Sequence, residues 1–349
     1  IVAIKGIGGY HLVCSPFNAD AVRRLRAMKG RESKPFAVMF PSLETAGQYG
    51  AVGPAEEALL RSPERPIVLV ERSGGDFPDS VCGAGRFIGA FLPYTPIQHL
   101  LLQQTGPLIM TSANQSELPI IYDDDSMLAF FQQHQDLAGV LTHNRKILRR
   151  LDDSVVAAVA GGPQFIRRAR GYVPLPLTLP AGVPDSPAIL ACGAQQKSTF
   201  CLAAGNLVYP GSEIGDLGSR ETVDVYRGAI QDMERLLRLT PEKIICDLHP
   251  RYESTRYAMA AGLPVLQVQH HYAHIASVMA ENGLTDPIIG VAFDGTGYGD
   301  DGTVWGGEFL IASPEGYERA GHLKPYRLLG ADEAVKQGWK TAEIGRAHV

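Results

Sequence analysis

Hydrophobic and polar positions follow two periods along the chain, one typical of strands and the other typical of helices. Val22, Leu25 and Met28 recur at helical spacing, so a helix is predicted over residues 18–29 with Asn18 as its N-cap. Short apolar runs and further helical patterns predict strands at 1–4, 34–40, 66–70 and 107–110, and helices at 42–49 and 96–103. This alternation predicts an α/β or mixed α+β domain.

The pattern restarts after a proline-rich stretch. The prolines at 174, 176, 180, 184 and 187 predict a stiff, extended linker over residues 173–187. Three short strands, a long helix and then alternating strands and helices are expected beyond it, at 188–192, 199–203, 207–210, 222–239, 243–246, 265–268 and 288–293. This order is compatible with one lobe of a ribonuclease-H-like, actin-like nucleotide-binding fold. We therefore expect two domains, 1–172 and 188–342.

The composition narrows the classes of protein. Hydrophobic residues make up 45% of the 349 positions and charged residues 20%, which excludes a mainly disordered chain. The net charge of −5 argues against a nucleic-acid partner. The 5 cysteines include no Cys-x-x-Cys pair, so neither a disulfide framework nor a cysteine-type zinc site is indicated, and a cytoplasmic location is expected. Because no run of 18 apolar residues occurs, we expect no membrane span.

Basic side chains gather at two places in the first domain. Lys29, Arg31 and Lys34 surround the turn between a predicted helix and a predicted strand, where they could converge on phosphate oxygens. The alternative is a solvated helix end whose cations complement the helix dipole. Arg167, Arg168 and Arg170 could line an anionic pocket, or they could pair at the surface with the aspartates at 152 and 153.

Hydrogen-bonding side chains follow an apolar strand of the same domain. Thr111, Ser112 and Asn114 come directly after the strand predicted at 107–110. Hydroxyl and amide groups at the carboxyl end of a strand can bind the phosphate or ribose of a ligand. The alternative is an ordinary polar turn that caps the strand.

Taken in order, the motifs of the first domain resemble those of the YrdC-like domain of the HypF family. They are Lys-Gly-Ile-Gly-Gly-Tyr-His at 5–11, Lys29-x-Arg31-x-x-Lys34-Pro35, Leu92-Pro93-Tyr94-Thr95-Pro96, Thr111-Ser112-Ala113-Asn114 and Arg167-Arg168-Ala169-Arg170-Gly171-Tyr172-Val173-Pro174. The resemblance implies a twisted-sheet domain that binds ATP with magnesium and forms carbamoyl-adenylate, using carbamoyl phosphate. It implies that four side chains hold the nucleotide and act on the acyl phosphate, namely Lys29, Arg31, Ser112 and Asn114. Arg149 is a further candidate.

A group of histidines is the most specific signal in the second domain. His270 and His274 are four residues apart at the start of a predicted helix, so they share one face and could chelate a metal ion. His271 points elsewhere. Asp294 follows a predicted strand and could supply a carboxylate ligand. Two imidazoles with one carboxylate suit Fe(II) or Zn(II), and the spacing does not choose between them.

Two turns of the second domain are candidate nucleotide contacts. Gly295 and Gly297 follow Asp294 and could let backbone N–H groups approach phosphates. The alternative is a plain Gly-Asp hairpin turn. Lys197 and Ser198 lie between the first two strands, where actin-, hexokinase- and Hsp70-like folds place a phosphate-binding turn. They could also simply face solvent in a hairpin.

The motifs of the second domain resemble the TsaD-like domain of HypF. They are Ala191-Cys192-Gly193-Ala194, Asp247-Leu248-His249-Pro250-x-Tyr252, Gln269-His270-His271-Tyr272-Ala273-His274, Asp294-Gly295-Thr296-Gly297-Tyr298-Gly299 and Trp305-Gly306-Gly307-Glu308-Phe309. The resemblance implies that His270, His274 and Asp294 bind iron or zinc. It also implies that the domain passes a carbamoyl group to a C-terminal cysteine of the partner HypE, in [NiFe]-hydrogenase maturation.

The chain also departs from the family. A full HypF begins with an acylphosphatase domain and cysteine-rich zinc-finger modules, and its TsaD-like domain has a second lobe. We therefore expect a central fragment of a longer protein, with a non-native tail at 343–349. One alternative is an enzyme of tRNA threonylcarbamoyl-adenosine biosynthesis, although TsaD proteins carry His-x-Glu-Gly-His where this chain has His-His-Tyr-Ala-His at 270–274. Another is an inactive nucleotide-binding scaffold.

Overall fold

The computed structural model describes residues 1–31, 34–73, 77–83, 85–114, 118–181 and 186–325. The chain divides into two compact units. The first comprises Ile1–Pro176, Gln195–Phe200 and Tyr209–Arg238, and the second comprises Leu177–Ala194, Cys201–Val208 and the chain from Leu239 onward. Two stretches that the sequence assigns to the second domain, 195–200 and 209–238, therefore cluster with the first unit. The tail expected at 343–349 lies outside the described residues.

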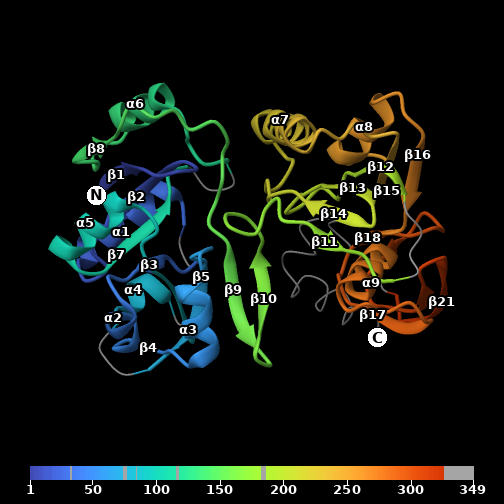
Figure 1. Cartoon of the computed structure of the whole chain (residues 1–349), viewed down its shortest axis with the longest axis horizontal. Helices are drawn as coiled ribbons and strands as arrows, with labels where there is room; N and C mark the ends of the chain where they lie inside the picture. The colour runs from blue at the N-terminus through green and yellow to red at the C-terminus, as the bar shows by residue number, and fades with distance from the viewer. Residues whose placement is uncertain (32–33, 74–76, 84, 115–117, 182–185, 326–349) are drawn as a thin grey trace, which may run out of the picture. The chain divides into compact units, whose positions relative to one another are not determined.

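A mixed sheet forms the first unit, with strand order β10-β9-β5-β6-β3-β7-β2-β1-β8 and with β4 paired to β5. Its strands are β1 (Val2–Lys5), β2 (Tyr10–Cys14), β3 (Ala37–Met39), β4 (Gly50–Ala51), β5 (Ile67–Arg72), β6 (Phe87–Phe91), β7 (Leu108–Ser112), β8 (Gly139–Leu141), β9 (Val155–Val159) and β10 (Gly162–Arg167). The antiparallel hairpin of β9 and β10 is drawn in green in Figure 1. The strands expected at 1–4, 34–40, 66–70 and 107–110 are confirmed as β1, β3, β5 and β7.

Helices α1 to α7 complete the first unit. They are α1 (Ala19–Lys29), α2 (Leu43–Gly47), α3 (Pro54–Arg61), α4 (Asp79–Cys82), α5 (Pro96–Thr105), α6 (Asp124–Gln133) and α7 (Arg220–Leu237). The side chain of Asn18 accepts a hydrogen bond from the backbone N–H of Ala21 at 3.0 Å, so the expected N-cap is confirmed. Gly30 ends α1 in the left-handed region, at φ +58°, where a glycine costs least. This turn sends the chain from Lys29 toward β3.

Apolar side chains cover both faces of the first sheet. Leu12 and Val38 belong to one buried cluster, whereas their neighbours Val13 and Met39 belong to another. Successive side chains of a strand point to opposite faces, so the two clusters lie on the two sides of the sheet. This double burial keeps the strand ends, including the end of β7, at fixed positions.

A six-stranded sheet with the order β11-β14-β13-β12-β15-β16 lies in the second unit. Its elements are β11 (Leu177–Thr178), β12 (Ser186–Ala191), β13 (Cys201–Gly205), β14 (Leu207–Pro210), β15 (Lys243–Asp247), α8 (Glu253–Ala260), β16 (Val265–Val268) and α9 (His270–Glu281). The expected order of strands and helices is confirmed. The stretch predicted as a linker, 173–187, contains β11 and the start of β12, so part of it is paired in this sheet.

The chain continues into a three-stranded antiparallel sheet of β17 (Ile288–Ala292), β20 (Glu308–Ser313) and β21 (Gly316–His322). Ile275 and Met279 of α9 pack in one buried cluster with Ala292, Leu310 and Ala312 of this sheet. Between β17 and β20 lies a short hairpin of β18 (Gly297–Tyr298) and β19 (Val304–Trp305). The Gly-Asp hairpin considered for this segment is therefore present. In the part of the chain that the structure describes, no helix has both the length and the apolar character to cross a bilayer.

Candidate functional site

The end of α1 meets the end of β7 at Lys29, which is buried with 4% of its surface exposed. Its Nζ donates to the carbonyl oxygens of Ser112 at 2.5 Å and Asn114 at 3.2 Å, and to Oδ1 of Asn114 at 2.6 Å. The hydroxyl of Ser112 also donates to Oδ1 of Asn114, at 2.8 Å. The structure thus brings three of the expected site residues, distant in sequence, into one hydrogen-bonded group.

The charge of Lys29 is poorly compensated. Burial is the main reason that the pKa of Lys29 falls to about 7, and the nearby Arg31 lowers it further, while Asp152 acts in the opposite direction. The acceptors that the described residues offer to its Nζ in hydrogen bonds are uncharged oxygens. An anionic ligand would therefore favour the protonated lysine, which is the property expected of a phosphate site.

Arg31 and Lys34 lie beside this group. Nη1 of Arg31 is 3.5 Å from Oγ1 of Thr111, and its Nε donates to the carbonyl oxygen of Lys34 at 3.1 Å. Burial and the neighbouring arginines lower the pKa of Arg31 to about 10. Desolvation, followed by the charge of Arg31, also lowers the pKa of Lys34. Several cations thus crowd one region of the first unit, which favours the binding of a polyanion.

Arginines further along the first unit are paired with carboxylates. Nη2 of Arg170 is 2.8 Å from Oδ1 of Asp153, and both side chains are at least nine-tenths buried. The pairing considered from sequence therefore occurs for these two residues, but in the interior and not at the surface. Arg149 is half-exposed, with its Nε 3.7 Å from Oδ2 of Asp232 in α7. Its role as a nucleotide contact stays a prediction.

The turn with Lys197 and Ser198 lies in the first unit, although it follows β12 in sequence. The backbone N–H of Lys197 donates to Oδ1 of Asp216 at 2.7 Å, and that of Ser198 donates to the carbonyl oxygen of Gly215 at 2.9 Å. The hydroxyl of Ser198 is buried, with no hydrogen-bond partner among the described residues. A buried hydroxyl of this kind can bind a ligand oxygen, and the phosphate role of the turn stays a prediction.

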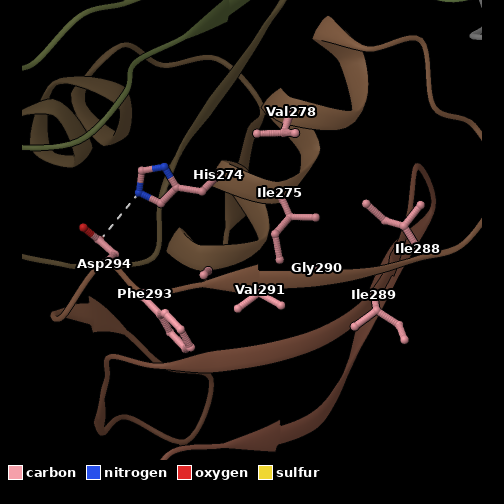
Figure 2. A pocket seen from close by; sticks show the side chains of 10 residues that line it. His274, Ile275, Val278, Ile288, Ile289, Gly290, Val291, Phe293 and Asp294 are labelled. Carbon is pink, nitrogen blue, oxygen red and sulfur yellow. Dashed lines mark ion pairs between the residues drawn. The ribbon is translucent and has the colours of Figure 1, made fainter. Parts of the chain in front are cut away.

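Three side chains of the second unit converge as a potential metal site. Oδ2 of Asp294 is 2.6 Å from Nε2 of His270 and 3.5 Å from Nε2 of His274, and the two imidazole nitrogens are 3.2 Å apart. Each of the three residues offers one ligand atom, a histidine nitrogen or a carboxylate oxygen, and these three atoms lie within 4.8 Å of one another. Figure 2 shows His274 of α9 and Asp294 after β17 pointing toward each other. The helical spacing predicted the approach of the two histidines, and Asp294 was a candidate ligand from its place after a strand.

The start of α9 orients the histidines. The side chain of Gln269 accepts a hydrogen bond from the backbone N–H of Tyr272 at 2.9 Å, so the helix begins at His270. His271 is fully buried, with Nδ1 3.2 Å from Nε2 of Gln269, and the potential metal ligands grouped among the described residues are His270, His274 and Asp294 without it, as expected. These contacts leave His270 and His274 together on the other side of the helix.

The two glycines after Asp294 have partners inside the chain. The N–H of Gly295 donates to the carbonyl oxygen of Gly306 at 3.0 Å. Gly297 lies against His271, because a Cβ at this position would be 2.5 Å from Cε1 of the imidazole. Close packing therefore accounts for the glycine at 297, and the phosphate contacts predicted for both glycines stay predictions.

Asp247, the last residue of β15, was not assigned a role from sequence. Its Oδ2 is 2.6 Å from Nδ1 of His270, and its Oδ1 accepts a hydrogen bond from the N–H of His249 at 2.8 Å. The bond to Asp247 is the main reason that the pKa of His270 is raised, while burial opposes it. The sequence offered only a carboxylate at the end of a predicted strand, and the parallel pairing of β15 with β16 that brings it beside α9 is seen in the structure.

The donors suit a transition metal. Two imidazoles of α9 and a carboxylate that follows β17 are the ligand types that Zn(II) and Fe(II) accept. The residues present therefore fit the expected metal. Next to His274 and Asp294 is a half-open hollow of about 380 Å³, lined otherwise by apolar residues of α9 and β17 such as Val278 and Val291 (Figure 2).

Comparison with family models identifies the class of protein. Residues 1–169 match the Sua5, YciO and YrdC family, described as "Telomere recombination". Residues 184–281 match the "HypF Kae1-like domain", and residues 290–346 match the "Carbamoyltransferase, Kae1-like Domain, second subdomain". The chain thus joins a YrdC-like domain to a Kae1-like domain.

Curated relatives and solved structures give the family. The chain is 43% identical to carbamoyltransferase HypF2 of Cupriavidus necator, over 98% of this chain and 45% of that protein. It is 42% identical to carbamoyltransferase HypF of Synechocystis, over 96% of this chain and 44% of that protein. It superposes with a TM-score of 0.91 on full-length HypF in the phosphate- and nucleotide-bound form, at 43% identity, covering 96% of this chain and 52% of that one. HypF of T. kodakarensis superposes with a TM-score of 0.88 at 42% identity, over 95% of this chain and 44% of that one.

The chain therefore belongs to the HypF family. It spans about half the length of the relatives that it matches.

Proposed function

We propose that this chain carries the carbamoyl-activating and carbamoyl-transferring sites of a HypF-type carbamoyltransferase of [NiFe]-hydrogenase maturation. The observation that carries the proposal is the presence of two different clusters in one HypF-family chain. The cluster around Lys29 favours anions, and the cluster around Asp294 favours a cation. A reaction that activates a group on a phosphate and then transfers it uses both properties.

The first unit would form the activated intermediate. Carbamate is supplied by hydrolysis of carbamoyl phosphate, and one of its oxygens attacks the α-phosphorus of ATP bound with magnesium. The bond from that phosphorus to pyrophosphate breaks, and carbamoyl-adenylate remains. Lys29 and Arg31 would stabilise the negative charge that develops on the phosphate oxygens. Ser112 and Asn114 hold the ammonium of Lys29 in place.

The second unit would transfer the carbamoyl group. A thiolate attacks the carbamoyl carbon, the bond from that carbon to the adenylate oxygen breaks, and AMP leaves. The acceptor we propose is the C-terminal cysteine of HypE, whose carbamoyl group is a precursor of the cyanide ligands of the hydrogenase iron. His270, His274 and Asp294 would hold Fe(II) or Zn(II), which when bound supplies Lewis-acid polarisation of a carbonyl.

An exchange assay tests the first step. Radiolabelled pyrophosphate should enter ATP when the protein is given carbamoyl phosphate, or ammonium bicarbonate as a source of carbamate. Exchange that requires threonine with bicarbonate would instead assign the chain to tRNA threonylcarbamoyl-adenosine synthesis. ATP binding without exchange under any of these conditions would reduce the chain to a nucleotide-binding scaffold.

A further inference from the structure

We infer that Asp247 is the positioning residue of the metal site, because it holds the Nδ1 side of His270 and so presents Nε2 to the cation. The inference rests on the metal site of the proposed function and adds a residue that no part of that proposal uses.

The register of the second sheet explains why these two residues meet. β15 and β16 are parallel neighbours, and Asp247 is paired in register with Val268. His270 follows Val268 by two residues, as the first residue of α9. The carboxylate at the end of one strand is therefore beside the helix that begins after the next strand.

The carboxylate of Asp247 is itself fixed. Oδ1 accepts the N–H of His249 at 2.8 Å, and only 6% of the side chain is exposed. The backbone carbonyl of Asp247 accepts from the hydroxyl of Thr255 in α8 at 3.2 Å. With Oδ1 occupied, Oδ2 is the oxygen that faces Nδ1 of His270 at 2.6 Å.

An imidazole has two nitrogens, and its tautomer decides which one can bind a metal. A carboxylate accepts a proton-bearing Nδ1, so the lone pair of the neutral ring lies on Nε2. Nε2 is the atom that lies 2.6 Å from Oδ2 of Asp294 and 3.2 Å from Nε2 of His274. If the pair of Asp247 and His270 had only a structural role, Nε2 of His270 would not need to face Asp294 and His274.

Asp247→Asn tests the inference with little change of shape. The asparagine oxygen would keep the hydrogen bond from His249, so its amide nitrogen would face Nδ1 of His270. Two donors cannot face each other, and the ring would then carry its proton on Nε2, the atom that binds the metal. We expect the zinc affinity of the variant, measured by competition with a chromophoric chelator, to fall by about 10- to 100-fold. The d–d absorption of the cobalt-substituted protein should also change.

Asp286→Asn is the matched control, because Asp286 is an exposed aspartate of the same unit. It should bind zinc as the parent chain does. If Asp247→Asn keeps its fold, judged by circular dichroism, and its zinc affinity remains within twofold of the parent chain, the inference is wrong.

Nitrogen NMR of the zinc-loaded parent chain provides a test that does not need the variant to fold. We expect His270 to carry its proton on Nδ1 and to bind zinc through Nε2. Binding through Nδ1 would overturn the inference and leave the proposed function intact. A parent chain that binds no zinc, iron or cobalt would instead remove the metal site from the proposed function, and the inference with it.

Discussion

The two candidate sites differ in the sign of the charge that their side chains carry in excess. In the first unit, Nζ of Lys29 is surrounded by carbonyl, amide and hydroxyl groups, with Arg31 nearby. In the second unit, the imidazole of His270 lies between the carboxylates of Asp247 and Asp294. The first site has cationic side chains whose charge nearby carboxylates do not fully compensate. The second site has carboxylates that could compensate the charge of a bound cation.

This difference shows in the direction of the pKa shifts. Burial and a like charge lower the pKa of Lys29 to about 7, whereas hydrogen bonds to carboxylates raise that of His270 despite its burial. Uncompensated charge at a buried site is unfavourable, so the site of Lys29 is expected to gain from an anionic ligand. The second site is more exposed, and there the carboxylates of Asp247 and Asp294 are expected to favour a cation. If the two sites are separable in this way, a change at one site should leave the other unaffected.

The largest effect should follow removal of both imidazoles. The double variant His270→Ala with His274→Ala leaves one carboxylate of the proposed ligand set, so stoichiometric metal should be lost. Elemental analysis after dialysis measures this loss, and pyrophosphate exchange should continue at the parent rate. The exposed His99→Ala serves as control. Retention of one metal ion per chain in the double variant would contradict the ligand assignment.

Lys29→Met should have the opposite effect, because it should reduce pyrophosphate exchange and leave metal binding unchanged. Removal of the buried cation takes away charge stabilisation at the phosphates, so pyrophosphate exchange should fall by about 100-fold or more. The metal content should not change. Lys146→Met replaces an exposed lysine and should retain exchange. Equal rates for the two lysine variants would mean that Lys29 has no part in the reaction.

The pH dependence of nucleotide binding should reveal the same lysine. Since the pKa of Lys29 in the free protein is about 7, much of it is neutral above that pH, and binding of a polyanion must then take up a proton. The affinity for Mg-ATP should fall as pH rises from 7 to 8, by at most about tenfold. Titration calorimetry in two buffers of different ionisation enthalpy measures the number of protons that the protein takes up when Mg-ATP binds. The proton uptake should disappear in Lys29→Met, and its persistence there would assign it to another group.

Asn114→Ala should give the smallest effect. It removes the side-chain oxygen that accepts from Lys29 and from Ser112, while the backbone carbonyl of residue 114 can still accept. The free energy of unfolding should fall by about 1–2 kcal/mol, measured by urea denaturation. Metal affinity should be the same as in the parent chain. A change in metal affinity would show that the two sites are coupled.

Much of the second site followed from local spacing. A separation of four residues on a helix places two side chains on one face, so His270 and His274 needed only the helix to meet. Asp294 was identified by its place after a strand, and Asn18 by the composition of helix N-caps. The contacts of the two histidines with each other and of Asn18 with Ala21 are made within a few residues, so local helix geometry sets them. Asp294 reaches the histidines from a more distant segment, and the sequence predicted only that it could supply a ligand.

Contacts between distant segments could not be derived in this way. The bond from Asp247 to His270 depends on the parallel register of β15 with β16. The partner of Arg170 depends on burial, which excluded water and left Asp153 as its counter-ion. Gly297, expected to approach a phosphate, lies against His271 because α9 packs closely on the hairpin. Periodicity acts along one element, whereas register, burial and close packing arise only when separate elements are assembled.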